Sequence, residues 1–395
     1  MNRRQFMRDA TVGTAAFTLP SFPMLGVGRQ RVSSRSNQAE IVFHVNPKTG
    51  DDANDGARAT PLRTLAEAGR RVSRSEGTGP ITVLLSEGIH SVAEEVGFRP
   101  QRRALSRTDR LTIRAEVLPD DPAWHWGLMP TLIHTMPLEP TWNGRPDPLG
   151  GAVNGMLIEA NHVSILGLRI LGLPVVESPI PGQIRRLYAV SRLRDDLDDL
   201  EVAHCVFAGD HVIAPNHVGI IARGNRVAVH HCIFRGLKIS AVYWSGASSG
   251  HAMHHCVLDD QYGSAVWTSG IADDFDYRNN VVTNSNYVWT WQGAASARAD
   301  AGGQRTQSSP LVRATNRYRV VDSHFGGNRR LAGTGTGARL EYADIDPSLL
   351  DLVRTTVSDQ PVPVENDQSN RRYLHPVSGT PAAATGAGLF TSIMR

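Results

Sequence analysis

Apolar and polar residues alternate in short runs along most of this chain, and the pattern recurs about every 24 residues. Three consecutive blocks align without gaps, at 227–250, 251–274 and 275–298. A looser copy covers 200–224, and a more distant one covers 162–174. A repeat of 20–50 residues is typical of stacked units, none of which buries its apolar side alone.

Within each block the runs are rich in Val, Ile, Trp and Tyr and are interrupted by Gly, Asn and Asp. This composition favours short strands separated by turns. Three strands in about 24 residues predict one coil of a right-handed parallel β-helix, so the predicted fold class is all-β. We place the core repeats at about 156–340.

One position of the repeat is occupied by Cys in three copies and by Asn in the next. The residues are Cys205, Cys232, Cys256 and Asn280. An odd number of cysteines excludes a fully paired disulfide framework. We therefore predict an inward ladder of packing residues.

The segments outside the repeats resemble a known group, the pectate-lyase-like parallel β-helix enzymes. The opening segment is FHVNPKTGDDANDGARATPLRTLAEA (43–68), the first coil is ITVLLSEGIH (81–90), and the closing segment is RRYLHPVSGTPAAATGAG (371–388). The group includes polysaccharide lyases and glycosidases. The resemblance implies a carbohydrate substrate and a single β-helix domain over 39–395, closed by residues 341–395, but it does not name a reaction.

The opening segment also predicts a short helix. Thr60 is a suitable N-cap and Pro61 suits the first helical position. Apolar residues follow at helical spacing, so we expect a helix that caps the end of the solenoid and covers its strand edges. Residues 115–155, rich in Trp, are expected to form an insertion or long loop between early coils.

Residues 1–38 resemble a twin-arginine export signal, with paired arginines followed by a short apolar stretch. We therefore expect a periplasmic or secreted protein; the alternative is a disordered basic tail. The apolar stretch is too short to span a bilayer, and no other membrane span is expected. The segment carries a net charge of +5, so the +3 of the whole chain leaves about −2 for the rest. This charge does not favour nucleic acid as a partner.

Strand alternation predicts a column of large side chains that point outward from one sheet. Aromatic faces stack on sugar rings, so this column is a candidate substrate platform; the alternative is a column covered by a loop or a second subunit. The residues are Ile221, Tyr243, Trp267 and Trp289, with Trp291 and Arg223 at the far edge of the same face.

Lys238 is the strongest candidate for a catalytic residue. The chain has only two lysines, Lys48 and Lys238, against 39 arginines. Lysine, unlike arginine, loses its proton when its pKa is depressed, so it can act as a base. Tyr262, in the next copy, is a candidate proton donor. The alternative for Lys238 is a solvated lysine in a turn.

Acidic and amide side chains gather in the same turns. Asp210, Asp259, Asp260 and Asn284 offer the oxygen ligands that calcium prefers. The adjacent acids Asp259 and Asp260 equally fit a catalytic pair of a hydrolase, or solvated turn residues. A second acidic cluster, with Asp273 and Asp274, lies on another turn.

His230 and His254 occupy equivalent positions, followed in the next copy by Arg278. A histidine column can bind metal. No carboxylate is evident at the same level, so we interpret the column as a surface ladder or an oligomer contact.

These observations predict an exported polysaccharide lyase that cleaves a uronic-acid glycan by β-elimination. Lys238 would take the proton at C5, while a bound Ca²⁺ or Arg223 neutralises the adjacent carboxylate. A first alternative is a glycoside hydrolase that uses two of Asp259, Asp260, Asp273 and Asp274. A second is a non-catalytic glycan-binding or structural β-helix, since fold does not separate the three. No organic cofactor is predicted.

Overall fold

The computed structural model describes nine ranges of the chain, and residues 38–395 form one compact unit. The described ranges are 40–137, 141–142, 145–146, 151–172, 186–211, 216–244, 248–292, 316–335 and 342–391. The export segment predicted at residues 1–38 lies outside them and stays a prediction. Within the described ranges, no helix is long and apolar enough to cross a membrane.

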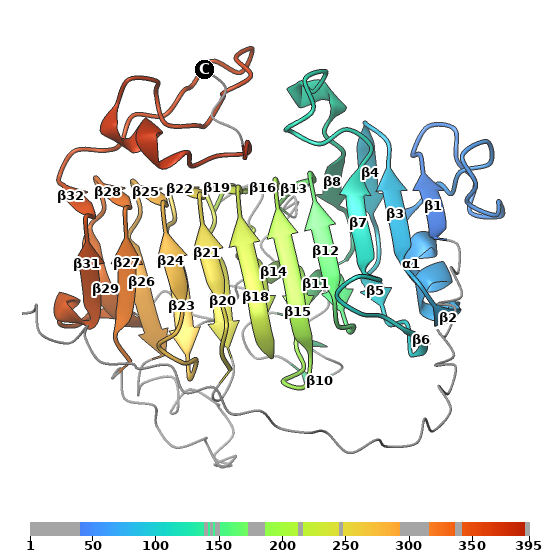
Figure 1. The fold of residues 1–395 in the computed structure, drawn as a ribbon, viewed down its shortest axis with the longest axis horizontal. Coiled ribbons are helices and arrows are strands. Elements are labelled where there is room, and N and C mark those ends of the chain that lie inside the picture. The colour runs from blue at the N-terminus through green and yellow to red at the C-terminus, as the bar shows by residue number, and fades with distance from the viewer. Residues whose placement is uncertain are drawn as a thin grey trace, which may run out of the picture. The chain divides into compact units, whose positions relative to one another are not determined.

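The described strands wind into successive coils, and strands of neighbouring coils pair in parallel (Figure 1). Three long sheets result, which we call sheets 1, 2 and 3 in the order in which the chain visits them within a coil. The fold is a right-handed parallel β-helix, as the sequence predicts. The distant copy at 162–174 and the first coil at 81–90 both belong to it.

A complete coil contributes one strand to each sheet. The strands of sheet 1 are β1 (Ile41–Val45), β3 (Ile81–Leu85), β7 (Leu111–Ala115), β12 (Val163–Leu166), β15 (Asp198–Ala203), β18 (Asn225–His230), β21 (Ala252–His254), β24 (Asp276–Arg278), β27 (Tyr318–Val321) and β31 (Leu350–Val353). The strands of sheet 2 are β4 (Ile89–Val92), β8 (Thr131–His134), β13 (Arg169–Leu171), β16 (Val206–Ala208), β19 (Ile233–Arg235), β22 (Val257–Asp259), β25 (Val281–Thr283), β28 (His324–Gly326) and β32 (Thr356–Ser358). The strands of sheet 3 are β5 (Val96–Phe98), β11 (Ala152–Ile158), β14 (Arg186–Arg192), β17 (Val218–Ala222), β20 (Ile239–Trp244), β23 (Ser264–Ser269), β26 (Tyr287–Gln292), β29 (Arg330–Gly335) and the antiparallel β30 (Tyr342–Asp344).

A few short elements lie outside the three sheets. They are the pair β2 (Glu76–Thr78) and β6 (Arg102–Ala104), the pair β9 (Thr141–Trp142) and β10 (Arg145–Pro146), and the 3₁₀ turns Trp126–Leu128, Pro347–Leu349 and Pro381–Thr385. The helix α1 (Leu65–Arg74) also lies outside the three sheets.

The turn between sheets 1 and 2 has the same backbone in successive coils. Its first residue is left-handed, with φ of 49° at His231, 56° at His255 and 55° at Asn279. His and Asn tolerate this conformation better than most residues do. The next residue points inward, and the predicted ladder is confirmed because Cys205, Cys232, Cys256 and Asn280 are all fully buried.

The helix α1 lies at the N-terminal end of the β-helix and caps it. Leu65, Ala68 and Val72 are buried in the main core, which continues through the interior of the coils. The helix begins later than predicted: Thr64, not Thr60, is its N-cap and accepts a hydrogen bond from the Glu67 N–H at 3.1 Å. The predicted start is wrong because Leu62 donates its N–H to the carbonyl of His44 and keeps this segment extended beside β1.

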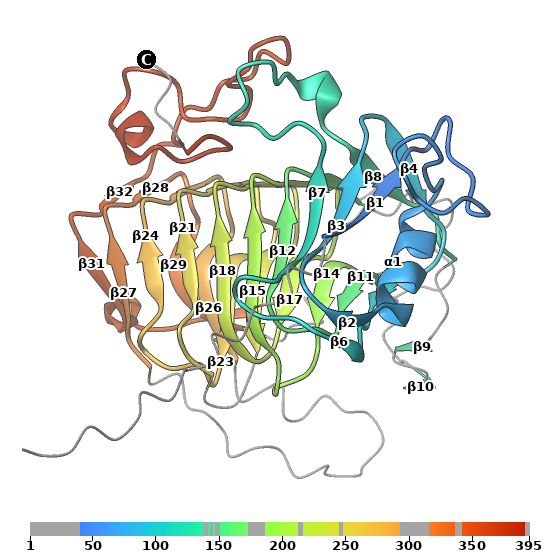
Figure 2. The ribbon, with the colours of Figure 1, turned by 45° about the vertical axis from the view of Figure 1, so that its right-hand side comes forward.

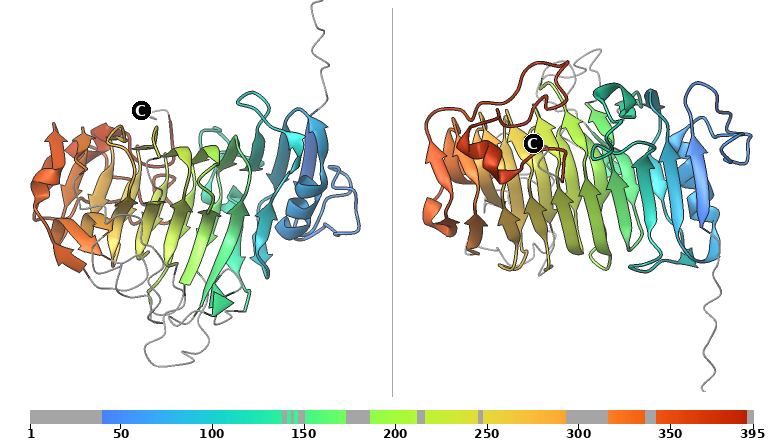
Figure 3. Two further views of the ribbon diagram at one scale, coloured as in Figure 1. Left: turned by 90° about the horizontal axis from the view of Figure 1, so that it is seen from below. Right: turned by 45° about the horizontal axis from the view of Figure 1, so that its top comes forward.

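The C-terminal segment crosses the outer face of sheet 2 and meets the Trp-rich insertion there (Figures 2 and 3). Trp124 packs against Phe390 with ring centroids 5.7 Å apart. The guanidinium of Arg371 donates hydrogen bonds to carbonyls of Pro119, Pro122 and Asp121. Residues 119–126 therefore pack against the chain's closing segment, some 250 residues away. The prediction of an insertion or long loop over 115–155 is wrong in part, because Thr131–His134 forms β8 of sheet 2 and Ala152–Ile158 forms β11 of sheet 3. The apolar cluster between them and the sheet includes Val206, Ile233, Val257 and Val281.

Candidate functional site

Lys238 is the last residue of the turn between β19 and β20, at the edge where sheet 2 leads into sheet 3. Its carbonyl accepts hydrogen bonds from the N–H groups of Gly263 and Ser264 in the next coil. The residue is only 1% exposed. Burial, together with the positive charge of Arg186, lowers the pKa of the Lys238 amine from 10.5 to about 7. At neutral pH the amine is therefore a competent proton acceptor.

Tyr342 lies beside Lys238, and the two residues meet at Gly263. A β-carbon added at Gly263 would lie 2.3 Å from the Tyr342 hydroxyl oxygen and 2.8 Å from Lys238 Cγ. Tyr262 is the preceding residue in the chain. Burial raises the pKa of both phenols, and the neighbouring Tyr262 adds to the rise at Tyr342. Both tyrosines therefore hold their protons at neutral pH.

The hydroxyl of Tyr342 has no hydrogen-bond partner within the described ranges, although it is buried. A buried polar group without a partner costs free energy and calls for an explanation. The oxygen lies in the same small region as the Lys238 side chain, on either side of Gly263. This hydroxyl is available to a bound molecule.

Arg186, and not the predicted Arg223, is the cation near Lys238. Arg186 begins β14, is 5% exposed, and shares a hydrogen bond with Tyr188. Arg223 follows the far end of β17, roughly 16 Å along the strand direction from the turn that holds Lys238. It forms an ion pair with Asp195 there and lies over the ring of Trp244. The predicted role of Arg223 in neutralising a carboxylate beside Lys238 is therefore wrong.

The predicted acidic residues gather on the outside of the same turns. The carboxylate of Asp259 lies 3.6 Å from the Arg235 guanidinium and accepts a hydrogen bond from the Asn284 amide at 2.9 Å. Asp260 has φ of 61°, and its pKa is raised by burial and by the Asp259 charge, with a smaller contribution from Asp210. Two carboxyl groups with different environments are thus adjacent, which suits an acid and a base.

The predicted calcium ligands do not form a ready site in this arrangement. Asn284 presents its NH₂ group to Asp259, whereas calcium requires the amide oxygen. Arg235 already provides the positive charge that faces Asp259. Among the described residues, the cluster of metal-ligating side chains is formed by histidines and not by these acids. Calcium binding stays a prediction. Asp274, in the second acidic cluster, accepts a hydrogen bond from Gly250 N–H.

The predicted aromatic platform is wrong for three of its four rings. Tyr243, Trp289 and Trp291 point into the core, with exposures of 1%, 0% and 4%. Trp267 lies on the opposite, outer face of sheet 3, where it packs with Ile221 and Val242. It too is only 4% exposed, and its indole N–H donates to the Gly335 carbonyl at 3.3 Å.

The reason is one extra residue in a single turn. Three residues separate β19 from β20, but four separate β22 from β23, and three again separate β25 from β26. Tyr243 consequently pairs with Thr268 and not with Trp267, and Trp289 pairs with Val266. Because side chains alternate with a period of two, a slip of one residue exchanges the faces. A gap-free alignment of the repeats does not reveal the extra residue.

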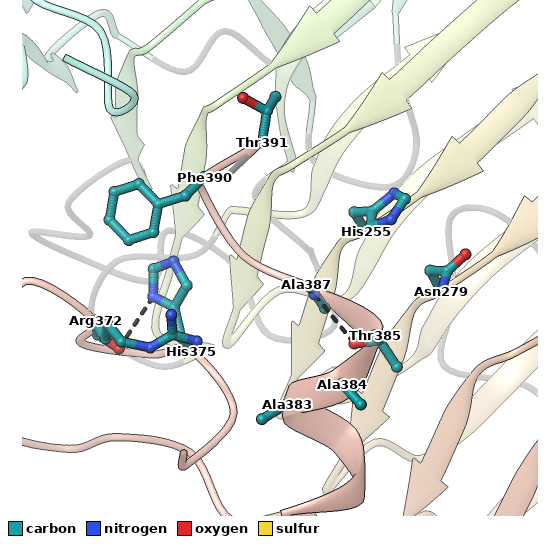
Figure 4. Close-up of a pocket in the computed structure, with 11 residues that line it drawn as sticks. His255, Asn279, Arg372, His375, Ala383, Ala384, Thr385, Ala387, Phe390 and Thr391 are labelled. Atoms are coloured by element: carbon teal, nitrogen blue, oxygen red, sulfur yellow. Dashed lines mark hydrogen bonds between the residues drawn. The ribbon is translucent and has the colours of Figure 1, made fainter. Parts of the chain in front are cut away.

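A cavity that the sequence does not predict lies under the C-terminal segment (Figure 4). Its volume is about 230 Å³. Its walls include Arg372 and His375 from that segment, and His255 and Asn279 from the turns between sheets 1 and 2. The cavity thus lies next to the turns between sheets 1 and 2. Lys238 lies in a turn between sheets 2 and 3, at the other end of the sheet 2 strands.

No family model matches the chain, and no curated protein matches it either. Several solved structures are similar to the chain. The pectin methylesterase PemA from Erwinia chrysanthemi is 11% identical with a TM-score of 0.41, and the match covers 80% of this chain and 89% of that one. YbhC of Escherichia coli is 11% identical with a TM-score of 0.40, covering 87% and 88%.

A GH136 lacto-N-biosidase from Eubacterium ramulus is 10% identical with a TM-score of 0.34. That match covers 76% of this chain, which spans only 58% of the biosidase.

Proposed function

We propose that this protein is a carbohydrate-acting enzyme, and that it cleaves a uronic-acid glycan by β-elimination. The observation that supports this proposal best is the convergence of Lys238, Tyr342 and Arg186 at the edge between sheets 2 and 3. It brings together a base, a hydroxyl donor and a fixed cation. The carbohydrate substrate is what the resemblance of the opening, first-coil and closing segments implies.

The proposed roles follow from the chemistry of each group. The Lys238 amine takes the C5 proton of a uronic acid, while the Arg186 guanidinium faces its carboxylate and stabilises the charge that develops there. The C4–O bond breaks as the C4=C5 double bond forms. The Tyr342 hydroxyl, or that of Tyr262, gives a proton to the departing oxygen. Proton return from Lys238 to the tyrosinate restores the starting state.

The burial of Lys238 sets a strict requirement on this proposal. The amine accepts a proton only from a sugar that reaches it, and at 1% exposure solvent does not reach it in this structure. A substrate therefore has to displace packed side chains to reach the amine. In Gly263→Ala the added methyl group would lie 2.6 Å from the Lys238 carbonyl oxygen and 2.3 Å from the Tyr342 hydroxyl, so it should shift both residues and lower the activity.

The proposal is tested by incubating the protein with a panel of uronate polymers and following ultraviolet absorbance, which reports the new double bond. Wild-type protein should generate the absorbance and Lys238→Met should not. Lys48→Met is the matched control, because it removes the chain's only other lysine, which is exposed. Lyase activity that survives Lys238→Met would remove Lys238 from the mechanism.

A second candidate function, glycoside hydrolysis, is favoured by one observation. Asp260 has a raised pKa beside the Asp259 carboxylate, which lies 3.6 Å from the Arg235 guanidinium. Asp260 would act as the acid and Asp259 as its partner. Reducing ends released without ultraviolet absorbance, and lost in Asp260→Asn, would favour this candidate over the lyase.

A further inference from the structure

Five histidines form a compact cluster at the turn between sheets 1 and 2, which we call the histidine cluster. Its members are His204, His230, His231, His254 and His255. The rings of His230 and His254 stack with centroids 4.9 Å apart, and those of His231 and His255 stack at 4.8 Å. The sequence identifies only the first of these stacks. The second stack arises because His231 and His255, the left-handed residues of their turns, direct their rings toward His230 and His254 at the ends of the preceding strands.

The two rings within one coil face each other through the same nitrogen. His230 Nδ1 lies 3.0 Å from His231 Nδ1, and His254 Nδ1 lies 2.9 Å from His255 Nδ1. Two neutral imidazoles at this distance either share one proton or present two lone pairs to a common point. The repeat of this arrangement in two successive coils places several such nitrogens together.

Glu201 supplies the carboxylate that the sequence does not reveal at this level. Its Oε1 lies 3.1 Å from His230 Nε2, and its Oε2 accepts a hydrogen bond from Ser164 Oγ at 2.7 Å. Because a carboxylate accepts hydrogen bonds, this contact places the His230 proton on Nε2, so that Nδ1 presents its lone pair to His231. Metal-binding histidines typically have such a carboxylate on the second nitrogen.

We propose that His230, His231 and His254 bind a divalent first-row transition-metal ion of the kind that accepts imidazole ligands. One ring nitrogen from each of the three lies within 4.8 Å of the others. Metal–nitrogen bonds of about 2.1 Å allow two ligand atoms to be at most about 4.2 Å apart, so the widest gap has to close by about 0.6 Å. The proposal therefore requires the rings to rotate when the ion binds.

The spacing of the first pair also indicates the type of ion. Two nitrogens 3.0 Å apart, each about 2.1 Å from a metal, subtend an angle of about 90°. This angle belongs to square-planar or octahedral sites and is smaller than the tetrahedral angle. Nickel, copper and cobalt are therefore expected to bind at least as well as zinc. The three imidazoles leave further positions open to water or another ligand.

The cavity beneath the C-terminal segment lies next to this group of rings, because its wall includes His255 of the histidine cluster (Figure 4). This inference does not depend on the proposed lyase activity.

The repeat supplies substitutions that the fold already accepts at equivalent positions. Ala203 pairs with His230 in the preceding coil, so His230→Ala copies a natural member of that column. Asn279, with φ of 55°, is the equivalent of His231 two coils away, so His231→Asn keeps a residue that suits the left-handed turn. His125→Asn is the matched control, since His125 is exposed and lies outside the cluster.

The test is a titration of the full, untagged protein with Co²⁺ and with Zn²⁺ at pH 7.5, followed by calorimetry and by the visible absorbance of cobalt. We expect one ion per chain. The double variant His230→Ala/His231→Asn should lower the affinity at least about 100-fold, and Glu201→Gln should lower it about 10- to 100-fold. His125→Asn should bind as the wild type does. Circular dichroism and the unfolding midpoint check that each variant is folded.

Two results would overturn the inference. One is the absence of saturable binding at equimolar metal. The other is undiminished binding by a folded double variant, which would assign the ion to another part of the protein.

Discussion

Replacing Lys238 with Met should stabilise the protein, and the gain should depend on pH. The lysine amine is buried and its pKa is about 7, against 10.5 when exposed. Below pH 7 the folded protein therefore has to hold a charged ammonium where water does not reach it. Methionine keeps most of the length of the side chain and removes the charge.

The magnitude follows from linkage between protonation and folding. Between pH 7 and 10.5 the unfolded chain binds the proton and the folded chain does not, so Lys238 makes the protein more stable as the pH rises through this window. The lowered pKa of Lys238 destabilises the folded protein by about 4.7 kcal/mol at pH 6 and by about 2 kcal/mol at pH 9, where the amine is neutral. The stabilising effect of Lys238→Met should therefore shrink by about 2.7 kcal/mol from pH 6 to pH 9.

The assay is urea denaturation of wild type and variant at both pH values, under otherwise identical conditions. Taking the difference between the two proteins cancels the contributions of all other titrating groups. Lys48→Met is the control, because Lys48 is exposed and its replacement should give no pH-dependent difference. Equal effects of Lys238→Met at pH 6 and pH 9 would show that the lysine is not held in a charge-excluding site, and the reasoning would fail.

Three further results are expected. If Lys238 is the base, kcat/KM should rise with pH and level off above about 7, because the amine must lose its proton to act; a profile that falls through this range would exclude it. Asp260→Asn should leave β-elimination within about threefold of wild type, since its carboxyl lies on the outer ridge, while a complete loss in the ultraviolet assay would favour the aspartate pair instead. Phe390→Ala should destabilise the C-terminal segment by about 3–5 kcal/mol, because this buried ring packs against Trp124 and His375; limited proteolysis would detect the loosened segment, and unchanged resistance would contradict the packing.

The sequence predicts the fold because a solenoid repeats the same local physics in every coil. The ladder of Cys205, Cys232 and Cys256 marks one position of that repeat, and its neighbours follow by alternation. Alternation is also where the prediction fails. The extra residue between β22 and β23 exchanges the two faces of sheet 3. The sequence does not mark this residue, because the turn that contains Gln261 is polar like its neighbours and differs from them only in length.

The candidate site is predicted only in part, for a related reason. Lys238 stands out through its rarity, and its depressed pKa fits the reason for choosing it. Arg186, Tyr342 and Glu201 are missed because they belong to coils whose repeat is less regular, so spacing does not connect them with their neighbours. Contacts between coils bring Arg186 and Tyr342 to Lys238, and Glu201 to His230. A single sequence does not reveal which coil contributes each partner.

The most direct test of the proposed function is the ultraviolet absorbance of product from a uronate polymer treated with wild type, Lys238→Met and Lys48→Met. Unsaturated product from wild type and Lys48→Met, and none from a folded Lys238→Met, is the result we predict. Equal absorbance from all three proteins would contradict Lys238 as the base, and reducing ends without absorbance would contradict β-elimination itself.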